Sequence, residues 1–201
     1  MNATVIDSPV ANTANIARAL RASGAELQIT RDADEIARAP KLVLPGVGSF
    51  VAAMQWLRDT RIDDAIREAV ARGAFLLGIC VGHQLLFDTS DEMEATCGLG
   101  LLRGAVRRFE GALPVPQIGW NRVSARAPLF DGIFDGIAPE TPFYFVNSYA
   151  ARGAGDEIAS ADYNGPFTAA VQRERVFGVQ FHPEKSSKAG LRVLRNFIAC
   201  K

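Results

Sequence analysis

Four short apolar runs in the first eighty residues are separated by amphipathic stretches, and this alternation limits the possible folds more than any other feature. Strands are predicted over residues 4–6, 27–29, 41–44 and 75–79. Helices are predicted over 15–23, 50–60, 61–72 and 82–89, with Gly24, Pro40 and Gly73 at the boundaries. Because such strands are apolar on both faces and are connected by helices, we expect a parallel sheet covered on both sides.

The pattern changes after about residue 98. Closely spaced strands are predicted over 106–109, 121–124, 142–146, 169–172 and 176–181, and a last helix over 189–199. Turn residues between these runs favour antiparallel pairing. No low-complexity linker or break in composition divides the chain. We therefore expect one α/β domain over residues 1–201, with a mixed central sheet flanked by helices.

Composition excludes several classes of protein. The 22 basic residues balance the 22 acidic ones, so no strongly basic surface for nucleic acid or anionic lipid is expected. No apolar run approaches the roughly 18–20 residues of a membrane span, and the first residues lack the pattern of a signal peptide. Three cysteines without a CxxC pair, and only two histidines, predict neither a structural zinc site nor a cofactor. A reducing cytoplasm is the expected location.

The strand predicted over 75–79 leads directly into Gly78-Ile79-Cys80-Val81-Gly82. A nucleophile between two glycines at a strand-to-helix turn is typical of a nucleophile elbow, which exposes the side chain at the edge of a sheet. The helix start favours a thiolate at Cys80, and the Val81 N–H is placed to stabilise an oxyanion. A buried structural cysteine between two packing glycines would give the same short motif.

A second motif changes the balance between these interpretations. The apolar run at 176–181 ends at His182, and Glu184 follows two residues later. In an extended chain, residues two apart point to the same side, so the carboxylate can orient the imidazole. Nucleophile, base and orienting acid then come from two strand ends. Alone, the His-Pro-Glu segment would equally suit a surface turn. His83 opens the predicted helix after Cys80, and we expect a structural role for it.

Residues 78–84 (GICVGHQ) and 181–184 (FHPE) together resemble the class I glutamine amidotransferases of the triad type. Members hydrolyse the amide of glutamine through a thioester and pass the ammonia to a synthase partner. The resemblance implies a catalytic triad of Cys80, His182 and Glu184 and oxyanion donors at the N–H groups of Val47 and Val81. It also implies contacts with substrate glutamine from Gly46, Gly48, Gln84, Ser148 and Tyr149. A solvated position on the helix explains Gln84 equally well.

Further stretches resemble one branch of this family, whose partner is a (β/α)8-barrel cyclase of histidine biosynthesis bound as a heterodimer. They are residues 44–50 (LPGVGSF), 98–101 (GLGL), 116–121 (PQIGWN) and 144–149 (YFVNSY). The resemblance places Asn12, Asn15, Trp120, Asn121 and Lys185 at the interface. Helix capping explains the two N-terminal asparagines equally well, a core position explains Trp120, and solvent exposure explains Lys185.

The chain departs from the branch at two places. Asn147 stands where a histidine is usual, and residues 10–15 lack the usual glycine-asparagine pair. Ala11 does not reach positive φ as easily as glycine does, so this loop is expected to differ in shape.

Three other functions are alternatives to the glutaminase hypothesis. Amidotransferase subunits for other acceptors, such as that of anthranilate synthase, fit the PGVGSF and PQIGWN stretches less well. A silent regulatory module has no need of Cys80, His182 and Glu184 together. A cysteine peptidase would require an open peptide cleft, on which the sequence gives no information.

Overall fold

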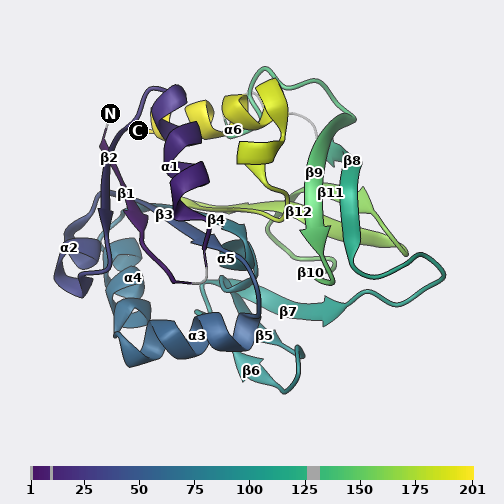
Figure 1. Ribbon diagram of the computed structural model, residues 1–201, viewed down its shortest axis with the longest axis horizontal. Helices are drawn as coiled ribbons and strands as arrows, with labels where there is room; N and C mark the ends of the chain where they lie inside the picture. Colours follow the sequence, from purple (N-terminus) through teal and green to yellow (C-terminus); the bar gives the residue numbers. More distant parts are fainter. Residues whose placement is uncertain (1, 10, 126–131) are drawn as a thin grey trace.

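The computed structural model describes residues 2–9, 11–125 and 132–201, so Val10 of the N-terminal loop lies outside the described residues. A nine-stranded sheet forms the centre of the molecule (Figure 1). Its first half is parallel, in the order β2 (Glu26–Thr30), β1 (Asn2–Ile6), β3 (Lys41–Gly46), β4 (Phe75–Cys80) and β13 (Val176–Val179). Its second half is antiparallel, in the order β12 (Pro166–Arg173), β11 (Glu157–Asp162), β8 (Gln117–Ala125) and β9 (Thr141–Asn147). The expected change from parallel to antiparallel pairing is confirmed.

Helices cover both faces of the parallel half. In Figure 1, α1 (Thr13–Ala22) and α6 (Ser187–Ala199) lie above the strands, whereas α3 (Phe50–Asp59) and α4 (Ile62–Ala71) lie below them. A short helix that was not predicted, α2 (Ala33–Arg38), packs against α4. The side chain of Asp32 caps it by accepting a hydrogen bond from the N–H of Glu35. The two-sided covering expected from the apolar strands is therefore present.

The helix predicted over 82–89 is wrong beyond its first turn. Helix α5 (Val81–Gln84) ends early, and β5 (Phe87–Ser90) follows it. The carbonyl oxygens of Leu85 and Leu86 accept hydrogen bonds from the N–H groups of Leu99 and Leu102, at 2.8 and 2.9 Å. These bonds to a distant segment replace those that would continue the helix.

The segment after α5 builds a second, smaller sheet, whereas a single sheet was expected. Its strand order is β10 (Tyr149–Ala151), β7 (Leu102–Arg108), β5 and β6 (Thr96–Cys97). Strand β7 begins four residues before the predicted start at 106, and β6, β10 and β11 were not predicted. These strands are short or contain exposed polar residues, so alternation of apolar residues does not reveal them.

A cluster of phenylalanines joins strands β9 and β12 to the segment that follows β13. The rings of Phe143 and Phe181 stack with centroids 4.1 Å apart, and Phe145 and Phe167 extend the cluster through edge contacts. All four side chains are fully buried. Phe181 directly precedes His182, so this packing fixes the backbone that carries the histidine. No helix in the described parts of the chain is long and apolar enough to cross a membrane.

Candidate active site

Three adjacent strands of the parallel half end at one edge of the sheet. Gly46 at the end of β3 is in register with Cys80 at the end of β4, and Ile79 is in register with Val179 at the end of β13. Because the carboxyl ends of parallel strands meet at the same edge, the loops that follow these strands are brought together. The order of the sheet thus joins three segments that are far apart in the sequence.

Cys80 has the backbone conformation of an elbow nucleophile. Its φ of 56° and ψ of −111° are unusual for a residue with a side chain, and such conformations cost of the order of 1–3 kcal/mol. A Cβ added to Gly78 would lie 2.5 Å from the carbonyl oxygen of Gly82, and one added to Gly82 would lie 1.9 Å from that of Leu44. Only glycine therefore allows this close approach of turn and strands.

His182 and Glu184 form a buried hydrogen-bonded pair. The imidazole Nδ1 lies 2.9 Å from Oε1 of the carboxylate, and the exposed fractions of the two side chains are 6% and 4%. The contact was predicted, but the reason for it was wrong. The strand ends at Val179, and the pair is brought together by a 3-10 turn at η1 (Pro183–Lys185) rather than by extended chain.

The charge state of His182 depends on both neighbours. Burial lowers the pKa of its imidazole, but hydrogen bonds with Cys80 and Glu184, and the negative charges of these groups, outweigh burial and raise that pKa to about 10. The protonated ring is therefore favoured over the ordinary pH range. Cys80 and His182 line the same cavity, so this proton faces the space in front of the sulfur atom.

His83, the other histidine, lies inside the protein. It is fully buried, and neither ring nitrogen has a hydrogen-bond partner among the described residues. Its ring packs edge-on against Phe87, and a Cβ on Gly178 would lie 2.3 Å from its Nδ1. Burial lowers the pKa of His83 to about 3, so the ring is neutral. Its surroundings are those of a packing residue, as expected.

A cavity of about 340 Å³ opens in front of Cys80. It is lined by most of the predicted site residues, namely Val47, Gly48, Cys80, Val81, Gln84, Ser148, Tyr149 and His182. Gly46 does not line it but lies behind the loop, where a Cβ would be 2.8 Å from the N atom of Gly82. Gln84 is buried, and its Nε2 donates to the carbonyl oxygen of Tyr149 at 2.9 Å. The alternative of a solvated helix residue at Gln84 is wrong.

The sequence did not indicate three further residues of the cavity wall. Glu92, Pro116 and Val146 line it beside Asn147, the position that departs from the family pattern. Glu92 accepts a hydrogen bond from the Phe50 N–H at 2.8 Å, which ties the loop after β5 to the start of α3. This contact depends on the small sheet, which was not predicted, so no local signal could have revealed it.

One group of residues predicted at the interface lies together at the rim of the cavity. Trp120 is 56% exposed, and its ring contacts that of Tyr144 at a centroid distance of 5.9 Å. The Lys185 Nζ lies 5.6 Å from the centre of the same tyrosine ring, and Lys185 also lines the cavity. The alternative of a core position for Trp120 is therefore wrong.

The other predicted interface residues have contacts within the chain. The side chain of Asn12 caps α1 by accepting from the Asn15 N–H at 3.3 Å, as the capping explanation predicts. Asn121 donates to the carbonyl oxygen of Asp162 at 2.8 Å. Neither asparagine of the N-terminal loop lines the cavity.

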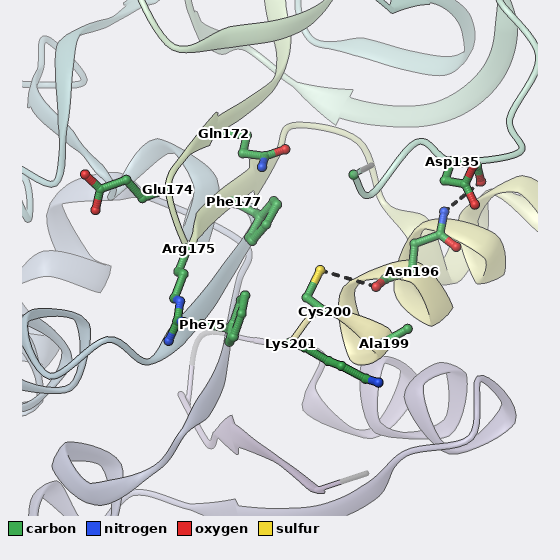
Figure 2. A pocket seen from close by; sticks show the side chains of 11 residues that line it. Phe75, Asp135, Gln172, Glu174, Arg175, Phe177, Asn196, Ala199, Cys200 and Lys201 are labelled. Atoms are coloured by element: carbon green, nitrogen blue, oxygen red, sulfur yellow. Dashed lines mark hydrogen bonds between the residues drawn. The ribbon is translucent and has the colours of Figure 1, made fainter. Parts of the chain in front are cut away.

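A second cavity, of about 470 Å³, lies at the opposite end of the central strand, where Phe75 begins β4 (Figure 2). Two of its polar side chains are engaged within the protein. Arg175 donates to the Gly73 carbonyl and lies over the Phe75 ring, and Asn196 donates to the carbonyl of Asp135. No three His, Cys, Asp or Glu side chains in the described ranges are grouped to hold a metal ion. The chemically competent groups are thus those around Cys80.

Comparison with known proteins agrees with this geometry. A family model described as glutamine amidotransferase class-I matches residues 4–200. The imidazole glycerol phosphate synthase subunit HisH of Moorella thermoacetica is 45% identical over 195 residues, which are 96% of this chain and 92% of that protein. The HisH subunit of Thermococcus kodakarensis is 46% identical over 201 residues, covering 96% and 97%. Among solved structures, PurLQS from Thermotoga maritima superimposes with a TM-score of 0.76 at 21% identity, covering 98% of this chain and 97% of that one.

Proposed function

The chain belongs to the class I glutamine amidotransferase family, and from this membership we propose that it is the glutaminase subunit of an imidazole glycerol phosphate synthase. It hydrolyses L-glutamine to glutamate and ammonia, and the ammonia is used in histidine biosynthesis. The observation that carries the proposal is the hydrogen-bonded pair of His182 and Glu184 beside the strained Cys80 at the wall of one cavity.

The first half of the reaction forms a thioester. The Cys80 thiolate attacks the amide carbon of the glutamine side chain, and the carbonyl oxygen takes up the negative charge. The N–H groups of Val47 and Val81 stabilise that oxyanion. His182, whose raised pKa keeps it protonated, gives its proton to the leaving nitrogen as the carbon–nitrogen bond breaks. Ammonia leaves, and the acyl group stays on sulfur.

The second half regenerates the enzyme. Neutral His182 removes a proton from water, the resulting hydroxide attacks the thioester, and the same two N–H groups stabilise the new oxyanion. Glutamate leaves as the carbon–sulfur bond breaks. Glu184 compensates the charge of the imidazolium in each half. Gln84, Ser148 and Tyr149, with Gly46 and Gly48 shaping the opposite loop, hold the amino-acid end of the substrate in the cavity.

The partner in this proposal is a (β/α)8-barrel cyclase bound as a heterodimer. The exposed Trp120 contacts the Tyr144 ring edge-on, and Lys185 lies over the same ring, so these residues form an aromatic surface next to the cavity that suits an interface. Asn121 lies on the same strand, whereas Asn12 and Asn15 form a separate contact at the start of α1. A cytoplasmic location belongs to the same proposal, since Cys80, Cys97 and Cys200 are all free.

The test is covalent labelling followed by kinetics. A glutamine analogue with an electrophilic carbon at the amide position is incubated with the protein, and the modified residue is found by mass spectrometry. Modification at Cys80, with exposed Cys97 as internal control, is expected. Glutamine hydrolysis is then measured with and without the cyclase. Labelling of Cys97 alone, or no hydrolysis with the cyclase present, would contradict the proposal.

A further inference from the structure

Gln180 lies behind the reacting sulfur atom, outside the cavity. It follows β13 directly, and its backbone N–H donates to the Ala169 carbonyl at 2.9 Å, so its position is fixed by the neighbouring strand β12. The side chain is fully buried. Its neighbours in sequence, Val179 and Phe181, are buried apolar residues. A carboxamide in this setting is costly unless it is hydrogen-bonded, so its contacts indicate why it is there.

The amide of Gln180 connects the nucleophile with Gln84. Its Nε2 lies 3.9 Å from the Cys80 Sγ, a distance at which an N–H donates to sulfur. Its Oε1 accepts a hydrogen bond from the Gln84 Nε2 at 3.0 Å. The same Gln84 nitrogen donates to the Tyr149 carbonyl at 2.9 Å. Both hydrogens of that nitrogen are thus used, and the Gln84 Oε1 is the atom left to act as an acceptor in the cavity.

These contacts determine the orientation of both amides. If the Gln180 amide were reversed, its NH2 would face the NH2 of Gln84 and its oxygen would face the thiolate. Two donors would then oppose each other, and the amide oxygen, which can only accept, would face the thiolate, which can also only accept. The fixed acceptor at Tyr149 excludes the compensating reversal of Gln84, because a backbone carbonyl cannot donate.

We propose that Gln180 is a positioning residue with two roles, donating an N–H to the Cys80 thiolate and holding Gln84 with its oxygen toward the ammonium group of the substrate. The proposal rests on the proposed glutaminase function for the second role only. Gln180 does not touch the substrate, since it does not line the cavity. Gln180 acts on the amino-acid end of the substrate through Gln84, and it acts on the Cys80 sulfur directly.

Two substitutions separate the roles. Gln180→Glu keeps the oxygen that accepts from Gln84 but replaces the donor with a carboxylate oxygen beside the sulfur. The pH midpoint of Cys80 alkylation by iodoacetamide should rise by about one unit, because a like charge disfavours the thiolate. The KM for glutamine should stay within about twofold, since the contact with Gln84 remains. Gln180→Leu removes both contacts. In this variant the alkylation midpoint should change and the KM for glutamine should also rise, by roughly tenfold.

Gln172 provides the matched control. It has the same side chain, lies on β12 opposite Phe177 of β13, and lines the cavity at the far end of the sheet. Gln172→Leu should leave the alkylation midpoint and KM unchanged. Thermal unfolding of each variant separates a local effect from a loss of fold. Should Gln180→Leu not fold, Gln180→Met replaces it, because methionine has a volume similar to that of glutamine and also removes both hydrogen bonds.

The possible outcomes are distinct. An unchanged alkylation midpoint together with an unchanged KM in a folded Gln180 variant would overturn the proposal, and so would equal effects of Gln172→Leu. Alkylation does not require turnover, so it tests the contact between Gln180 and Cys80 even in the absence of glutaminase activity. Wild-type protein that is alkylated at Cys80 but never hydrolyses glutamine would overturn the proposed function and leave the first role of Gln180 standing.

Discussion

The Nδ1 atom of His182 lies 2.9 Å from the Oε1 atom of Glu184 because a single 3-10 turn follows the end of β13. The turn is itself held by β9, since the His182 N–H donates to the Tyr144 carbonyl at 2.8 Å and the Ser186 hydroxyl accepts from the Tyr144 N–H at 3.0 Å. The geometry of the pair is therefore a property of the antiparallel half of the sheet as well as of the turn.

Glu184→Gln should leave the fold intact and slow glutamine hydrolysis by orders of magnitude. The amide has nearly the same shape, but the imidazolium at His182 loses its compensating charge. The measurement is kcat with the cyclase present. Glu174→Gln, at an exposed turn between β12 and β13, is the control and should behave as wild type. If Glu184→Gln keeps most of its activity, the third member of the triad is another residue.

Substitution of Cys80 should abolish hydrolysis, and two different substitutions should distinguish the loss of the nucleophile from the backbone strain at this position. Both Cys80→Ala and Cys80→Gly remove the covalent route. The glycine variant should be the more stable of the two by about 1 kcal/mol, because glycine adopts a φ of 56° without strain. Urea unfolding and a glutaminase assay test both points. Turnover near wild type in either variant would refute the role of Cys80, and an alanine variant as stable as the glycine one would refute the strain.

The pKa values of the two histidines should be shifted in opposite directions from the ordinary value of an imidazole. NMR can resolve the two rings because the chain contains only two histidines. We expect the imidazole signals of His83 to stay those of the neutral ring until pH approaches about 3, whereas His182 loses its proton only near pH 10. In Cys80→Ala the pKa of His182 should fall, since one hydrogen bond and one negative charge are lost. Equal titration midpoints for both rings near 6.5 would contradict this account.

His83→Met should reduce the sensitivity of the fold to acid. The unfolded chain binds a proton at His83 near pH 6.5 but the folded chain only near pH 3, so stability is lost as pH falls through that window. The loss is up to about 1.4 kcal/mol for each pH unit. Urea unfolding at pH 7 and pH 4.5 should show a smaller difference in the variant than in wild type. The same pH dependence in both would contradict the lowered pKa of His83.

Gly48→Ala should lower the rate of glutamine hydrolysis through the loop that carries the Val47 N–H. Gly48 has a φ of +84°, and no atom lies within 4 Å of the position that a Cβ would occupy, so backbone strain alone opposes alanine. Gly24, with a φ of +94° and equally open surroundings, is a matched control far from the cavity. Both variants should lose about 1 kcal/mol of stability. Only Gly48→Ala should lose activity. Equal activities of the two variants would contradict a role of this loop in stabilising the oxyanion.

The same loop suggests that the partner controls activity. If the Val47 N–H is an oxyanion donor, as proposed above, rotation of that peptide adds or removes the donor, and one such donor contributes on the order of 10²–10³ in rate. We expect slow hydrolysis without the cyclase and faster hydrolysis with the cyclase and its nucleotide ligand. Equal rates in the two states would eliminate the switch.

The parallel half of the fold and the elbow could be predicted from sequence because their signals are local. A wholly apolar strand, two glycines with no room for a Cβ and a cysteine between them are contiguous in the chain around Cys80. The small sheet could not be predicted in this way. The bonds that end α5 come from Leu99 and Leu102, and nothing near Leu85 distinguishes a continuing helix from one that is cut short by distant strands.

Two site residues escaped prediction for a related reason. Glu92 reaches the start of α3 only through the loop after β5, and Gln180 meets Cys80 only through the pairing of β13 with β4. Trp120 shows the converse case, since sequence left a core and a surface position equally open and only the fold exposes it. Motifs find residues that act next to each other in sequence, whereas residues that support them from distant strands require the structure.

The place of β13 in the sheet determines when the active site can form during synthesis of the chain. This strand is made from the last part of the chain, yet it inserts between β4 and β12 and is the direct neighbour of the strand that carries Cys80. While the ribosome is still synthesising the antiparallel half, β4 lacks that neighbour, and His182 does not yet exist. A nascent chain therefore holds its cysteine without a base and without a complete pocket. We therefore expect no glutamine hydrolysis by the nascent chain until synthesis is nearly finished.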